Sequence, residues 1–189
     1  MQPRLIVRIA SAALLTAVAS SGIMVAQQQG PPIVPKPGPE HEILKLDAGT
    51  WDAKIELVPG PGVPMITSNG VETNTIGCGG TCLITDVKAE MMPGVPFSGH
   101  GIMTWDPVKK AYVGSWADNM MVGLARSETT YDPATKKHSG WTEGMEEGKP
   151  MKTRVVVEYP TPTTRTMTSF ATGPDGKEFQ MLKISYTKK

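Results

Sequence analysis

The feature that most constrains this chain is the alternation of apolar and polar residues over short stretches. In WDAKIELV, which starts at Trp51, apolar residues occupy every second position and charged residues stand between them. A period of two with one apolar face is typical of a half-buried β-strand. The same pattern recurs in three further stretches, 83–91, 151–159 and 178–188. The chain is therefore expected to fold largely as sheet.

Weaker strand patterns and regularly placed turns fill the rest of the domain. The weaker patterns cover 65–76, 97–105, 111–118, 121–131, 137–143 and 163–172. Asp-Pro pairs at 106–107 and 132–133 start turns, because Asp bonds to the following backbone and Pro presets φ. About ten short strands joined in order by tight turns predict an all-β fold, an antiparallel meander. Closure into a β-barrel is the simplest way for such a sheet to protect its edges, and a β-sandwich is the competing architecture.

The sequence divides into three stretches. Residues 1–26 carry two arginines, an apolar core and small residues near their end, which is the layout of a secretory signal peptide. Cleavage after Ala26 fits this layout best, cleavage after Ala19 is second, and an uncleaved anchor is the alternative. Residues 27–38, rich in Gln and Pro, read as a linker, and 39–189 as one barrel domain.

A signal peptide implies an exported protein, either periplasmic or secreted, with no membrane association after cleavage. The formal net charge of +1 and the lack of a Lys/Arg run give no support for nucleic acid or an anionic membrane as a partner. Ahead of the first strand, a short N-terminal helix is expected to start at Pro39 and to end at Gly49. No cofactor is expected.

The only two cysteines, Cys78 and Cys82, have two glycines between them. In an extended strand, residues four apart lie about 13 Å apart, too far for a disulfide, whose Cα atoms lie about 4.4–6.8 Å apart. The glycines permit a tight turn, and cysteines of exported proteins tend to oxidise, so a local disulfide is the preferred prediction. Two free thiols, or a redox or metal-binding pair, are the alternatives. The spacing and the lack of an adjacent histidine do not support zinc, and no metal site is expected.

Gly49-Thr50-Trp51 lies just after the expected helix and opens the first strand. It resembles the Gly-x-Trp signature of lipocalins and other calycin barrels. In those folds the tryptophan closes one end of the barrel, and a cation from the last strand lies over its ring. The resemblance implies that Gly49 and Trp51 close the barrel here and that Lys188 supplies the cation, a contact worth about 0.5–2 kcal/mol.

A longer resemblance runs over roughly residues 36–189. The stretches that carry it include KPGPEHEILKLDAGTWDAKIEL, PFSGHGIMTWD, YVGSWADNM and GPDGKEFQMLKISYTKK. They are similar to the DUF1579 family, a group of bacterial domains of unassigned function placed among the calycin-like barrels. The resemblance implies a calycin/lipocalin-like barrel and brings no catalytic residues with it. Thr81 and Cys82 depart from the family, which usually has an arginine and an aromatic residue at these positions.

Such a barrel predicts a protein that binds a small apolar or amphipathic molecule in its interior. The expected strand 121–131 carries Arg126 and Glu128 in phase with Val122 and Leu124. A charged pair on that face could point into a cavity and orient a ligand, or it could face water and leave the small residues inside. The candidate ligand-binding residues are Met103, Trp116, Arg126 and Glu128.

Two other functions remain open. An isomerase or cyclase would hold its substrate beside a carboxylate and Arg126, but the sequence has no catalytic motif, so an enzyme is less expected than a binder. Copper or redox handling could use the cysteines and the ten methionines after residue 26, although filling an irregular interior is the commoner role of methionine. His100 is a candidate haem ligand. His138, beside two lysines near a turn, is expected to face solvent.

Overall fold

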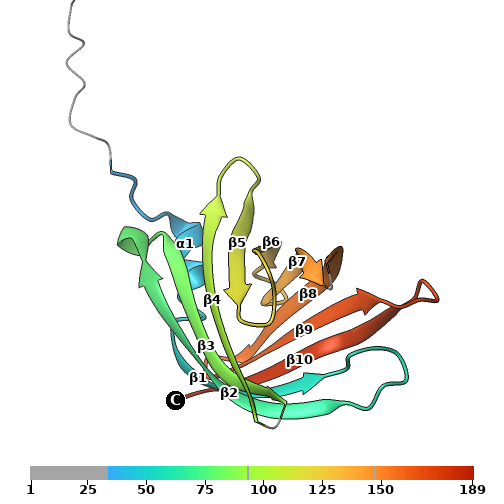
Figure 1. The fold of residues 1–189 in the computed structure, drawn as a ribbon. Helices are drawn as coiled ribbons and strands as arrows, with labels where there is room; N and C mark the ends of the chain where they lie inside the picture. The colour runs from blue at the N-terminus through green and yellow to red at the C-terminus, as the bar shows by residue number, and fades with distance from the viewer. Residues whose placement is uncertain (1–33, 93, 147) are drawn as a thin grey trace, which may run out of the picture. The chain divides into compact units, whose positions relative to one another are not determined.

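The computed structural model describes residues 34–92, 94–146 and 148–189. The expected signal peptide, and the expected linker through residue 33, lie outside the described residues. Within the described part, one short helix, α1 (Pro39–Leu44), precedes ten strands (Figure 1). The strands are β1 (Gly49–Leu57), β2 (Ile66–Gly77), β3 (Cys82–Met92), β4 (Val95–Asp106), β5 (Ala111–Asp118), β6 (Ala125–Asp132), β7 (Lys137–Glu146), β8 (Lys149–Thr161), β9 (Thr164–Thr172) and β10 (Glu178–Lys188).

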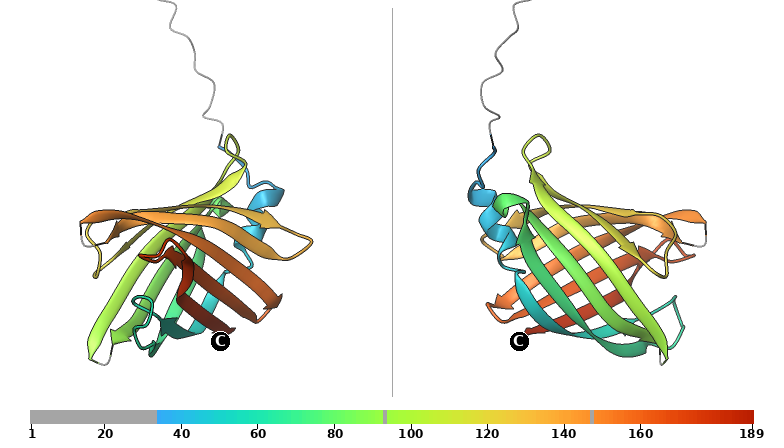
Figure 2. Two further views of the ribbon diagram at one scale, coloured as in Figure 1. Left: turned by 90° about the vertical axis from the view of Figure 1, so that its right-hand side faces the viewer. Right: turned by 60° about the vertical axis from the view of Figure 1, so that its left-hand side comes forward.

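The strands form a closed barrel. Each strand pairs antiparallel with the next along the chain, and β10 returns to pair with β1 (Figure 1, Figure 2). The β1–β10 ladder runs from the Trp51–Lys188 pair to the Leu57–Leu182 pair. This ladder confirms the predicted all-β meander barrel and excludes the sandwich, in which the first and last strands would leave free edges. Within the described residues, no helix is both long and apolar enough to cross a membrane.

The largest departures from the predicted element boundaries are at the end of α1 and at the start of β6. α1 ends at Leu44 instead of continuing to Gly49. Gly49 opens β1 with a φ of 118°, and a Cβ there would lie 2.9 Å from Lys188 Cε. β6 begins at Ala125 instead of 121, because Gly123 adopts a φ of 98° and interrupts the extended chain.

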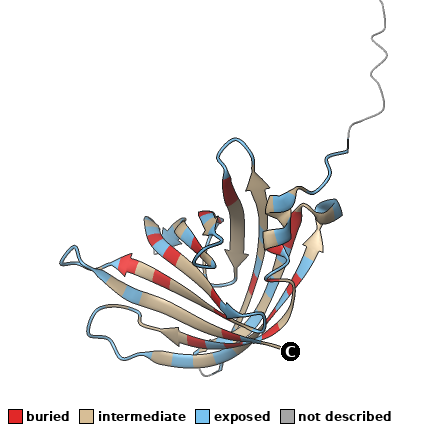
Figure 3. Ribbon diagram, turned by 180° about the vertical axis from the view of Figure 1, so that it is seen from behind, coloured by how far each residue is buried: buried red, intermediate tan, exposed pale blue. Residues whose placement is uncertain are grey.

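The register of the ladders decides which side chains face the interior. On β1, Trp51, Ala53 and Ile55 are buried and alternate with the exposed Asp52 and Lys54. Residues that pair across an antiparallel ladder share a face, so the partners of the buried residues continue the inner wall around the barrel. Figure 3 shows the resulting alternation of burial along the strands.

The two ends of the barrel differ. The most deeply buried end, here called the floor, comprises Asp47, Trp51, Glu72, Arg165 and Tyr186. α1 packs near this end, where Leu44 contacts the buried cluster of Leu83 and Tyr112. The opposite end, here called the mouth, carries the β1–β2, β3–β4, β5–β6, β7–β8 and β9–β10 connections.

Candidate functional site

A buried arginine ties the floor together. Arg165 on β9 is 7% exposed, and its guanidinium donates to Asp47 Oδ1 and to Glu72 Oε1. Asn74 donates to the Asp47 backbone carbonyl at 2.9 Å and to Glu72 Oε1 at 2.6 Å, and the Tyr159 hydroxyl donates to Asp47 Oδ2 at 2.9 Å. Burial opposes the charged form of Arg165, but the two carboxylates outweigh burial and raise its pKa. Both floor carboxylates, of Asp47 and Glu72, are therefore already paired with other side chains of the protein.

Trp51 seals the floor beneath this cluster. Its side chain is 1% exposed, and its Nε1 donates to the Asp47 carbonyl at 2.8 Å. The Arg165 guanidinium carbon lies 4.8 Å from the Trp51 ring centroid, and Lys188 Nζ lies 5.2 Å from it. Arg165, the nearer and buried cation, was missed from sequence. The sequence signal that could have indicated its burial is its position two residues before Met167, on the same face of β9.

His138 corrects another expectation. It is 5% exposed instead of facing solvent, because β7 begins at Lys137 and places His138 inward, in register with Tyr131 and Val157. Its ring centroid lies 4.8 Å from that of Tyr112 and 5.0 Å from that of Tyr131. Burial lowers the pKa of His138 to about 4, so the imidazole is neutral near pH 7.

Between floor and mouth, the inner wall is apolar or neutral. Val87, Met103, Met167 and Ile184 face inward by register and yet keep partial solvent exposure. Side chains that filled the barrel would bury these residues, so solvent reaches the interior. Among the described residues, the ladders assign no Asp, Glu, Lys or Arg side chain to the wall between the floor and Asp118 at the mouth end of β5, and His138 on that wall is neutral near pH 7.

Trp116 lies flat against the inner wall. A Cβ on Gly99 would lie 2.1 Å from the indole, and a Cβ on Gly101 would lie 2.9 Å from it, so glycine at both positions makes room for the ring. The Trp116 Nε1 donates to Asp118 Oδ2 at 2.8 Å, and Phe97 stacks at 6.5 Å between centroids. The result is an aromatic patch on the inner wall of β4 and β5.

A row of hydroxyl groups occupies the neighbouring sector of the inner wall. Ser127 on β6 pairs with Thr142 on β7, and Thr142 pairs with Thr153 on β8. Thr153 Oγ1 makes only a long bond of 3.5 Å to the Thr142 carbonyl. The side-chain hydroxyls of Ser127 and Thr142 bond to no other described residue. On β2, the inward-facing Ser68 Oγ is shielded from solvent and also lacks a partner among the described atoms.

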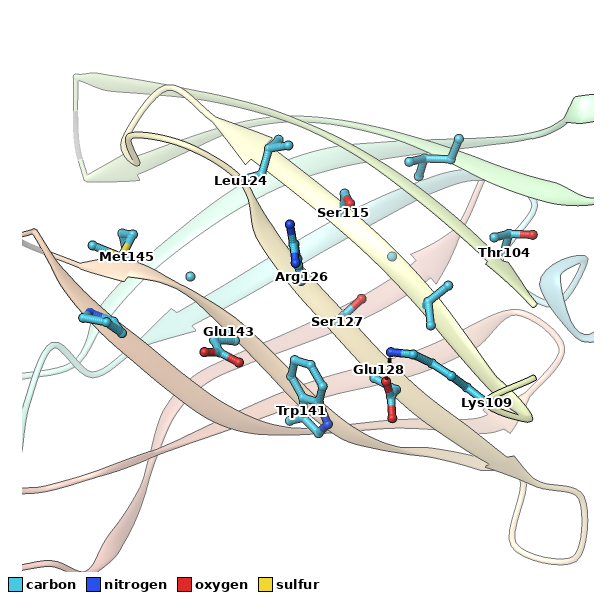
Figure 4. Close-up of a pocket in the computed structure, with 15 residues that line it drawn as sticks. Thr104, Lys109, Ser115, Leu124, Arg126, Ser127, Glu128, Trp141, Glu143 and Met145 are labelled. Atoms are coloured by element: carbon cyan, nitrogen blue, oxygen red, sulfur yellow. Dashed lines mark hydrogen bonds and ion pairs between the residues drawn. The ribbon is translucent and has the colours of Figure 1, made fainter. Parts of the chain in front are cut away.

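Arg126 and Glu128 lie on the outer surface of the barrel. They alternate with Ala125 and Thr129, which are buried and face inward. They line an outer groove of about 700 Å³ over β4 to β8, where Lys109 Nζ donates to Glu128 Oε2 at 2.6 Å (Figure 4).

Of the two orientations that the sequence left open, the structure therefore shows the outward one, so Arg126 and Glu128 are not contacts for a ligand inside the barrel. Val122 and Leu124 had suggested the inward phase, but both belong to the β5–β6 connection, where strand alternation does not apply. The structure brings Met103 and Trp116 to the interior and places the other two candidates on the opposite side of the sheet. The arrangement expected for an enzyme, a carboxylate beside Arg126 in the cavity, is also absent from the described interior.

The sulfur-containing and histidine candidates do not converge. Cys78 and Cys82 form the predicted disulfide, with Cα atoms 5.4 Å apart, so neither is a free thiolate. It lies at the floor end of the barrel, whereas Met120 lies in the β5–β6 connection at the mouth. His100 is exposed on the outer face, with Nδ1 2.5 Å from Asp86 Oδ1, and so lies outside the interior. The described residues contain no group of three or more His, Cys, Asp or Glu placed to hold a metal ion.

The comparisons with known proteins agree with this architecture. A family model described as "Protein of unknown function (DUF1579)" matches residues 36–188, which confirms the resemblance seen in the sequence. No curated protein matches the chain. An S-type phycobiliprotein lyase from Guillardia theta is similar in structure, with a TM-score of 0.53 and 9% identity over 79% of this chain and 92% of that chain. A redesigned β-barrel has a TM-score of 0.40 and 14% identity over 78% and 95% of the two chains. The likeness to the lyase supports the barrel fold.

Proposed function

The chain belongs to the DUF1579 family, and from that premise we propose that it is an exported protein whose barrel interior binds a small apolar or amphipathic molecule. The observation that carries the proposal is the solvent-accessible, uncharged inner wall between floor and mouth. A closed sheet shields a bound molecule from water, and apolar contact stabilises it by about 25 cal/mol per Å² of buried apolar surface. Met103 and Trp116 are the proposed contacts.

The mouth supplies an apolar entrance. In the β5–β6 connection, Val122 is 91% exposed, and Met120 and Leu124 are exposed beside it. Met65 and Met92, at the ends of strands that meet the mouth, are exposed as well. Methionine adapts its shape at little cost, which suits an entrance for ligands that arrive in different orientations.

Export is the second part of the proposal. The layout of residues 1–26 supports it, and a disulfide between Cys78 and Cys82 fits a periplasmic or extracellular compartment, where such bonds persist. Native mass spectrometry of the protein from the exported fraction of its host tests this part. The expected mass lacks residues 1–26 and is two hydrogens below the reduced chain, with any retained ligand as a non-covalent adduct. Recovery of the full-length chain from the cytosol alone would contradict export.

The binding site itself is tested by two adjacent substitutions on β7. Thr142 faces inward and Glu143 faces outward, where it lines the outer groove. Thr142→Trp fills the interior, and we expect it to weaken binding of the neutral fluorophore N-phenyl-1-naphthylamine at least about tenfold, or about 1.4 kcal/mol. Glu143→Trp should leave that affinity unchanged, with circular dichroism confirming that both variants fold. Loss of affinity in Glu143→Trp alone would move the site to the outer groove.

A further inference from the structure

We propose that the barrel interior selects uncharged ligands and that the hydroxyl row of Ser127, Thr142 and Thr153 supplies their hydrogen bonds. This inference rests on the proposed function, since it specifies the chemical class of the molecule bound there. The ligand class is a rigid, largely apolar molecule that carries a neutral polar group, such as an alcohol, carbonyl or amide, along one edge.

Charge limits which ligands the interior can hold. An ionised ligand group placed inside the barrel loses its hydration and needs an opposite charge to replace it. The floor cannot provide one, because Arg165 already pairs with Asp47 and Glu72 in a buried cluster. At the mouth, Asp118 holds the Trp116 indole and the Met120 backbone N–H, and Lys149, which the β7–β8 register places on the inward face, is exposed to water at the rim. The described wall between them carries no Asp, Glu, Lys or Arg side chain to take either role, and His138 on that wall is buried and neutral near pH 7.

The polar groups that the wall does offer are hydroxyls. Ser127, Thr142 and Thr153 lie on three adjacent strands at one level of the wall. Each hydroxyl can donate or accept, and the described residues leave those of Ser127 and Thr142 without a partner. A row of such groups matches a neutral polar edge, because hydroxyls exchange readily for the water that the ligand displaces.

The arrangement of the wall favours a flat ligand. The aromatic patch of Phe97 and Trp116 lies on β4 and β5, and the hydroxyl row begins on the neighbouring strand β6. One sector of the wall thus offers a flat apolar surface and the next offers hydrogen bonds. A planar ring system that lies on the aromatic patch would bring a substituent on its edge to the hydroxyl row. This arrangement favours polycyclic or conjugated molecules over flexible chains.

Three matched probes test the selectivity: pyrene, 1-pyrenemethanol and 1-pyrenecarboxylate, titrated by fluorescence near pH 7. We expect the alcohol to bind at least about tenfold tighter than the carboxylate, because the described wall between the paired Arg165 and the mouth has no Lys or Arg for the carboxylate. Thr142→Val should weaken the alcohol roughly three- to tenfold, the effect of one neutral hydrogen bond, and leave pyrene unchanged. Thr130→Val, the same change on the outer face of β6, should alter neither affinity.

The outcomes separate the inference from the function on which it rests. Equal affinity for the alcohol and the carboxylate would overturn the charge selectivity, and equal weakening of pyrene and the alcohol by Thr142→Val would overturn the role of the hydroxyl row. In both cases pyrene still binds and the proposed function stands. If none of the three probes binds the wild-type protein, the proposed function fails and the inference fails with it.

Discussion

At the scale of single residues, Arg165 has the largest structural consequence. It sits between Asp47 and Glu72 and against the rings of Trp51 and Tyr186, all at the buried end of the barrel. A buried ion pair adds little stability compared with apolar packing, but removing one partner strands the other charges in a low-dielectric environment. Loss of Arg165 should therefore destabilise the protein more than loss of one residue from a surface ion pair.

Replacing Arg165 tests this dependence. Arg165→Met keeps the apolar stem but leaves two buried carboxylates, and we expect a loss of about 3–5 kcal/mol in the free energy of unfolding near pH 7. Arg154→Met is the matched control, because the exposed Arg154–Glu178 pair is screened by water and its loss should cost far less. Urea denaturation measures both. Equal effects of the two substitutions would contradict a special role for the floor.

His138 makes stability depend on pH. Burial holds its folded-state pKa at about 4, against 6.5 for a histidine side chain in water. Between these values the unfolded chain binds more protons, so stability is complete above pH 6.5 and falls as the pH drops toward 4, by up to about 3 kcal/mol. His138→Phe should remove this part of the slope of unfolding free energy against pH. An unchanged slope in the variant would mean that His138 titrates normally in the folded protein.

At the scale of elements, the strands follow from the sequence because their alternation and turns are local signals. The start of β6 does not follow from the sequence. The positive φ of Gly123 interrupts the extended backbone within a stretch whose apolar pattern reads as one continuous strand. Because the strand start was misplaced, the outward orientation of Arg126 could not be assigned from the pattern either. The burial of His138 was also hidden, because the inward phase of β7 depends on pairing with β6 and β8, not on the lysines beside it.

The Trp116 patch depends on β4 having no side chains beneath the indole. Gly99→Ala places a methyl group 2.1 Å from the ring, so the indole must move, and we expect a loss of about 1–3 kcal/mol in unfolding free energy. Gly60→Ala is the control, because a Cβ there lies in ordinary contact, 3.7 Å from Val63. Chemical denaturation and tryptophan fluorescence follow the change. Unaltered fluorescence in Gly99→Ala would show that the indole does not lie on β4.

At the scale of the whole molecule, the barrel has a sealed, charged floor and a mouth with exposed apolar side chains, with a neutral wall between them. The family resemblance and the strand order were sufficient to predict the closed sheet. The floor and the hydroxyl row could not be predicted, because they assemble residues from strands far apart in the sequence and depend on the exact register of each ladder. The outer groove is the competing location for a ligand. It lies on the outer face of the sheet, whereas Met103 and Met167 lie on the inner face.

Methionine methyl NMR tests the central claim most directly. Met103 and Met167 face the interior, whereas Met145 lines the outer groove. In protein labelled at the methionine methyl groups with carbon-13, titration with N-phenyl-1-naphthylamine should shift the Met103 and Met167 signals through the ring current of the bound fluorophore and leave Met145 in place. A shift of Met145 with Met103 and Met167 unmoved would place the ligand in the outer groove and contradict binding inside the barrel.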